Sequence, residues 1–96
     1  MLSRNYERLE RTLVGLVIEQ TLLHIGKPVY DKVESLLYER YNSTIANSCD
    51  NPQYLCEILK EVFGKSHLEI INSIETRLTD FRYEPIIEEF VAKMSK

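Results

Sequence analysis

The sequence predicts an all-α protein, with residues 1–96 forming a single compact domain of about five helices that includes a helix-turn-helix-like hairpin. Three observations support this fold class. Apolar residues recur at helical spacing along most of the chain, glycines and prolines separate the periodic segments, and no strand-like alternation extends beyond four residues. A chain of 96 residues can bury one hydrophobic core but is too short for two.

The first predicted helix covers residues 2–25 and carries two apolar stripes. The first stripe advances in alternating steps of four and three residues, with Gln20 filling its one gap, and consists of Leu2, Tyr6, Leu9, Leu13, Leu16 and Leu23. The second begins at Leu13 and adds Val14, Val17, Ile18, Leu22 and Ile25. We therefore expect the first half of this helix to lie on a surface or a partner, and the second half to be central to the core.

Glycine and proline set the bounds of the second helix. Gly26 suits the left-handed residue just past a helix end, and Pro28 can occupy the first position of the next helix. We expect that helix to cover residues 28–46. Its inner face would consist of Val29, Val33, Leu36, Leu37, Tyr41 and Ile45.

The third and fourth helices form the predicted hairpin. Asp50 or Asn51 can cap the third helix, which has a proline in its first turn and ends at Gly64. Ser66 and Glu69 match the capping box that opens a helix. The fourth helix would run to about residue 78 with an apolar set of Leu68, Ile70, Ile71, Ile74 and Leu78, and a last helix begins at Glu84 and Pro85.

Composition excludes several classes of protein. The formal net charge is −3, with six basic and six acidic residues in 1–45 and six against nine in 46–96. A nucleic-acid surface would therefore be a local patch rather than a property of the whole chain. The first residues lack the pattern of a signal peptide, and the most apolar run, 12–25, is too short and too polar to span a bilayer. We expect a cytoplasmic protein with no membrane partner and with free thiols.

No pattern of catalytic or metal-binding residues is present. Cys49, Cys56, His24 and His67 are possible zinc ligands, but their spacing matches no zinc motif, so we expect no metal and no cofactor. We expect His24 to be packed in the core. Because catalytic triads, glycine-rich phosphate loops and paired metal-binding histidines are all missing, we predict that the protein is not an enzyme and has no catalytic residues.

Two sets of residues are candidates for contact with DNA. Arg4, Arg8 and Arg11 share one helical face and would contact phosphates, although Glu7 and Glu10 lie among them. The alternative is a solvated charged face beside a dimer seam, for which we predict Tyr6, Leu9, Leu13 and Leu16. The second set would project from the hairpin and consists of Lys65, His67, Asn72 and Arg77. A plain helical hairpin fits this stretch equally well.

A resemblance to a known family covers about half of the chain. It is carried by Leu36-Leu37-x-x-x-Tyr41, Cys49-Asp50-Asn51-Pro52-x-x-Leu55, Leu59-Lys60-x-x-Phe63-Gly64-x-Ser66 and Ile70-x-x-Ser73-Ile74. These residues resemble the NitrOD group, the Nitrososphaera output domains of ammonia-oxidising archaea. The resemblance implies a small helical archaeal domain that stands alone or is fused to signal receivers, and that acts in regulation by binding DNA.

Two functional hypotheses follow. The first is a stand-alone regulatory output-type domain that binds double-stranded DNA weakly as a homodimer, in transcription or signalling. The second is a protein-protein interaction module that does not bind nucleic acid and receives a receiver domain or another regulatory protein. Convergence of the basic side chains on one face would favour the first, and their dispersal would favour the second.

Overall fold

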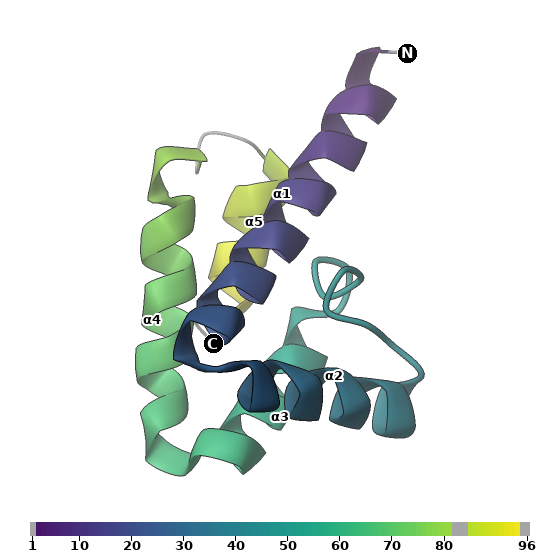
Figure 1. Ribbon diagram of the computed structural model, residues 1–96. Coiled ribbons are helices and arrows are strands. Elements are labelled where there is room, and N and C mark those ends of the chain that lie inside the picture. The colour runs from purple at the N-terminus through teal and green to yellow at the C-terminus, as the bar shows by residue number, and fades with distance from the viewer. Residues whose placement is uncertain (1, 82–84, 95–96) are drawn as a thin grey trace.

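The computed structural model describes the backbone of residues 2–81 and 85–94, and the side chains of 8–80 and 85–94. The described residues form five α-helices and no strand, which confirms the predicted all-α fold. The helices are α1 (Leu2–Ile25), α2 (Lys27–Tyr41), α3 (Pro52–Phe63), α4 (His67–Leu78) and α5 (Pro85–Met94) (Figure 1). Two single turns of 3-10 helix, η1 (Gly64–Ser66) and η2 (Thr79–Phe81), flank α4.

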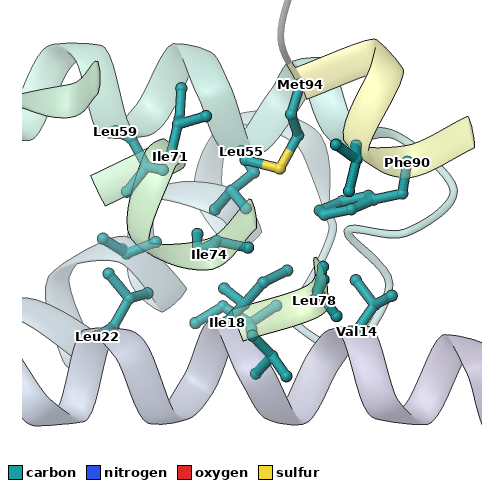
Figure 2. Close-up of a cluster of buried hydrophobic side chains, with 14 of the residues drawn as sticks. Val14, Ile18, Leu22, Leu55, Leu59, Ile71, Ile74, Leu78, Phe90 and Met94 are labelled. Atoms are coloured by element: carbon teal, nitrogen blue, oxygen red, sulfur yellow. The ribbon is translucent and has the colours of Figure 1, made fainter. Parts of the chain in front are cut away.

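The core forms around α1, which contacts α2, α4 and α5. Val14, Ile18 and Leu22 are fully buried, as expected for the second half of this helix. They face apolar side chains from the other helices, and Figure 2 shows Leu55 and Leu59 of α3, Ile71, Ile74 and Leu78 of α4, and Phe90 and Met94 of α5 in the same cluster. Burial of these side chains is the main stabilising contribution to the fold.

The corner between α1 and α2 consists of one residue, Gly26. Its backbone is extended, with φ 162° and ψ 146°, so the expectation of a left-handed glycine is wrong. The reason is that α2 begins at the next residue, Lys27, so the chain changes direction without a longer cap. The Gly26 N–H still donates to the Leu22 carbonyl at 3.0 Å, which extends the hydrogen bonding of α1.

The second helix is shorter than predicted, because it ends at Tyr41 rather than at residue 46. Asn42 takes the left-handed conformation (φ 52°), which asparagine tolerates better than most residues. The N–H groups of Asn42 and Ser43 then donate to the carbonyls of Tyr38 and Leu37. Ile45 was expected on the inner face of the helix. It is buried as predicted, but it enters the core from the loop.

Polar and aromatic contacts join α2 to α3. The rings of Tyr41 and Tyr54 stack with their centroids 4.1 Å apart and their planes within 3°. The Tyr41 hydroxyl donates to Glu57, and Arg40 forms a 2.6 Å ion pair with Glu61. These contacts hold α3 against the last turn of α2, and both helices lie across the C-terminal end of α1 (Figure 1).

The hairpin between α3 and α4 turns at Gly64, as predicted, with a positive φ of 61° that favours glycine. The expected capping box is wrong, because Ser66 has helical backbone angles and its side chain makes no capping hydrogen bond. The η1 turn leads directly into α4, which leaves no non-helical residue to act as the cap. Leu68 was also expected in the core, but 64% of it is exposed.

A carboxylate of α1 holds the start of α5. Glu10 is only 8% exposed, and its Oε2 accepts a hydrogen bond of 3.2 Å from the backbone N–H of Ile86. A carboxylate is favourable there, because the first N–H groups of a helix lack internal partners and the helix dipole is positive at that end. Glu10 therefore has a structural partner and does not lie in a solvated charged face.

Close contact between α1 and the α2–α3 loop depends on Gly15. A Cβ atom at this position would lie 3.3 Å from the Ala46 Cα, so the backbones approach closely. We expect Gly15→Val to lower the free energy of unfolding by about 1–3 kcal/mol, because the added methyl groups must displace the loop. Urea denaturation measures this effect.

Thr76→Val serves as the control for Gly15→Val, since Thr76 is exposed on α4. It should change the free energy of unfolding by no more than about 0.5 kcal/mol. Equal effects of the two substitutions would show that the contact between Gly15 and Ala46 does not constrain the loop.

Candidate functional site

The main surface feature is a second apolar face on α1. Leu9, Leu16 and Leu23 are 66%, 47% and 41% exposed. They recur every seven residues and drift by about 20° per repeat around a helix of 3.6 residues per turn. At about 100° per residue, they lie roughly opposite Val14 and Ile18, which are in the core. We call Leu9, Leu16 and Leu23 the leucine stripe.

The leucine stripe overlaps the predicted dimer seam in part. Leu9 and Leu16 belong to both, whereas Leu13 is half-buried and packs against the core at the edge of the stripe. The side chain of Tyr6 lies outside the described residues. The predicted seam did not extend to Leu23, although the spacing of four and three residues continues through it.

A groove of about 570 Å³ adjoins the leucine stripe. It lies between α1, α2 and the loop that joins α2 to α3, and Leu16 contributes to both the groove and the stripe. Its apolar lining includes Ile45 and Ala46 of the loop. Its volume is within the range of ligand pockets, about 300–1,000 Å³. The groove and the stripe form one continuous surface.

Charged side chains line both ends of this groove. Arg8 and Arg11, two of the arginines predicted to contact phosphates, both lie in its wall. Arg11 forms an exposed ion pair with Asp50 of the loop, which fastens the loop to α1. Among the described residues, Arg8 forms no ion pair. The side chain of Arg4 is not among those described.

At the other end of the groove, Glu34 supports the loop. Its Oε1 accepts a 2.8 Å hydrogen bond from the Ile45 N–H, and its Oε2 accepts one of 3.5 Å from the Tyr30 hydroxyl. Burial, followed by the negative charge of Glu34, raises the pKa of Tyr30. Tyr30 therefore stays a neutral hydrogen-bond donor at physiological pH.

The hairpin residues predicted to contact DNA do not share one face. Asn72 and Arg77 are exposed on α4, but five residues of helix place them about 140° apart around its axis. Lys65 is exposed in η1, twelve residues before Arg77, which corresponds to about 18 Å along a helix axis. His67 is half-buried, with its Nδ1 2.8 Å from the Gly64 carbonyl oxygen.

The possible zinc ligands are also dispersed. Within the described part of the chain, no three His, Cys, Asp or Glu side chains are arranged to hold a metal ion. Cys49 and Cys56 are free thiols, as predicted. The expectation that His24 packs in the core is wrong, because it is exposed. It lies in the last turn of α1.

Comparisons with known proteins add no assignment. The described helices include none that is long and apolar enough to cross a membrane. No protein family model, curated protein or solved structure matches the chain. The resemblance to the NitrOD group and its regulatory role therefore stay predictions.

The Cys49 thiol offers a test of burial beside the groove. Burial raises its pKa to about 11 from the ordinary value of 9.0. Because the thiolate is the reactive form, we expect alkylation at pH 8 to be about 100-fold slower than for an unshifted thiol. The rate should keep rising with pH beyond 9 and level off only above the raised pKa.

The measurement uses a Cys56→Ser variant, so that Cys49 is the single thiol. Iodoacetamide labelling is followed as a function of pH in the folded protein and in about 8 M urea, where burial no longer raises the pKa of the thiol above its ordinary value. Identical pH profiles in the two states would contradict burial of this thiol.

Proposed function

We propose that this protein is an interaction module that self-associates through the leucine stripe. The observation that supports the proposal is the exposure of Leu9, Leu16 and Leu23 on the face of α1 opposite the core. A surface helix that packs against its own domain on a single side needs one apolar face. A second aligned apolar face therefore indicates a binding surface. The proposal combines the predicted homodimer with the interaction hypothesis.

The expected affinity is modest. Full burial of a leucine side chain contributes about 1.5–3 kcal/mol, and each residue of the stripe has 41–66% of its surface left to bury. Over two subunits this amounts to about 5–9 kcal/mol, which is similar to the cost of association, about 4–15 kcal/mol. Contacts beside the stripe must supply the remainder. We therefore expect a dimer that forms and dissociates with protein concentration.

Leu16→Asp should make the protein monomeric. The substitution places a charge at the centre of the stripe, where association would bury it without a partner. Analytical ultracentrifugation between about 5 and 500 µM covers the range in which interfaces of this strength dissociate. Leu9→Asp, at the most exposed position of the stripe, should have the same effect with less disturbance of the fold.

Leu68→Asp is the matched control, because Leu68 is equally exposed on α4 but lies outside the stripe. It should leave the dimer intact. Circular dichroism checks that all three variants keep their helices. A wild-type protein that stays monomeric over the whole concentration range would overturn the proposal, as would a dimer that survives both Leu9→Asp and Leu16→Asp.

DNA binding by the homodimer, in transcription or signalling, is the second candidate function. It is favoured by Arg8, which is exposed and forms no ion pair among the described residues. Against it, Lys65, Asn72 and Arg77 point in different directions, and Arg11 is paired with Asp50. The net charge of −3 also opposes attraction to a polyanion.

We therefore expect the wild-type protein to show no saturable binding to a random DNA duplex at about 50 mM salt, by fluorescence anisotropy. Binding that saturates and falls steeply at about 200 mM salt would favour the DNA-binding hypothesis instead. In that case Arg8→Ala and Arg77→Ala would identify the surface, because loss of a phosphate contact lowers the salt slope by about 1.

A further inference from the structure

We infer that the leucine stripe binds a second copy of this chain with the two α1 helices parallel. Each residue of the contact then lies beside the same residue of the second copy. The inference rests on the proposed self-association and adds the orientation of the pair. The seam consists of positions that alternate in steps of three and four along the exposed side of α1. Within the described side chains these are Leu9, Leu13, Leu16, Gln20 and Leu23.

This seam has the heptad spacing of a two-stranded coiled coil. Leu9, Leu16 and Leu23 occupy one of the two seam positions of the heptad, the position at which leucine favours pairs of helices. Leu13 and Gln20 occupy the other. Because the pattern is carried by one continuous helix, a second copy of α1 presents the same spacing and can interdigitate with it.

Gln20 favours the parallel orientation. It is exposed, and it is the only polar side chain of the seam within the described residues. In a parallel pair the two-fold axis runs along the helices, so Gln20 faces its own copy. An amide carries both donors and an acceptor, so two copies can satisfy each other. An antiparallel pair that joins Leu9 to Leu23 would separate the two Gln20 residues by about 12 Å along the helix axes. Each amide would then lose water without gaining the other as a partner.

The residues beside the seam also match a parallel partner. In parallel coiled coils, the residue just before the heptad position occupied here by Leu13 and Gln20 lies near the partner-helix residue whose number is higher by five. This relation brings Glu19 of one copy to His24 of the other, twice per dimer. Glu19 is half-buried and His24 is exposed. A carboxylate can accept a hydrogen bond from either imidazole nitrogen that carries a proton.

The domain leaves room for the second helix. The stripe faces away from the core, and the N-terminal end of α1 extends beyond the other helices (Figure 1). The partner would therefore approach from the side opposite α2, α4 and α5. A parallel pair would also bring the two Arg8 side chains to the same end of the dimer, whereas an antiparallel pair would separate them.

Disulfide cross-linking tests the orientation directly. Leu9→Cys and Leu23→Cys are made separately in a background in which Cys49 and Cys56 are replaced by serine. A disulfide needs Cα atoms about 4.4–6.8 Å apart. Positions 9 and 23 are about 21 Å apart along the helix, so both can meet their own copies only in a parallel pair. Thr76→Cys, exposed on α4, measures cross-linking by random collision.

We expect both Leu9→Cys and Leu23→Cys to form covalent dimers at least about tenfold faster than Thr76→Cys. A mixture of the two variants should yield few Leu9–Leu23 mixed disulfides. In a second measurement, Gln20→Leu should tighten the dimer, because a polar seam residue specifies pairing at a cost in stability. Weaker association of Gln20→Leu would contradict the role of the amide.

Other outcomes separate the two proposals. Mixed disulfides without self-linked ones would overturn the parallel orientation but leave self-association through the stripe standing. A dimer in which neither position cross-links above the Thr76→Cys control, alone or in the mixture, would overturn the parallel orientation. Leu16→Asp then decides about the interface, because a dimer that survives this substitution does not use the stripe. A monomer at all concentrations would overturn the proposed function itself.

Discussion

The structure depends on α1 serving two surfaces at once. Its buried face, formed by Val14, Ile18 and Leu22, is the surface on which α2, α4 and α5 pack, so the other helices have no common core without it. The opposite face carries leucines that this domain does not cover. A helix that is apolar on both sides is ordinarily buried on both sides. This constraint connects the stability of the fold to the proposed interaction.

The surroundings of α1 are held by contacts that are individually small. Glu10 binds the start of α5, Arg11 pairs with Asp50, and Glu34 accepts a hydrogen bond from the loop at Ile45. The absence of a side chain at Gly15 lets that loop approach. These contacts hold the loop near α1 and thereby form the groove beside the leucine stripe. Leu16 of α1 and Ala46 of the loop both line that groove.

The basic residues illustrate how a linear pattern can mislead about a surface. Arg4, Arg8 and Arg11 were expected to form one phosphate-binding face, and the structure does bring Arg8 and Arg11 to the same groove. There, however, Arg11 has a structural partner in Asp50. The hairpin residues are divided between η1 and different sides of α4, so their proximity in sequence does not make a common surface. The interaction hypothesis rests on the spacing of Leu9, Leu16 and Leu23, which the fold leaves together on one exposed face of α1.

The sequence by itself determined the helical fold. Apolar residues at helical spacing, and the helix boundaries at Gly26, Pro52 and Gly64, follow from the chemistry of residues close together in the chain. It also contained the seven-residue spacing of the leucine stripe. Only the tertiary structure decided which apolar face of α1 is buried, since both stripes have helical periodicity and the choice depends on which one α2, α4 and α5 cover. In the same way, burial of Glu10, exposure of His24 and Leu68, and the early end of α2 at Asn42 follow from neighbours distant in sequence or from backbone geometry that no residue pattern specifies.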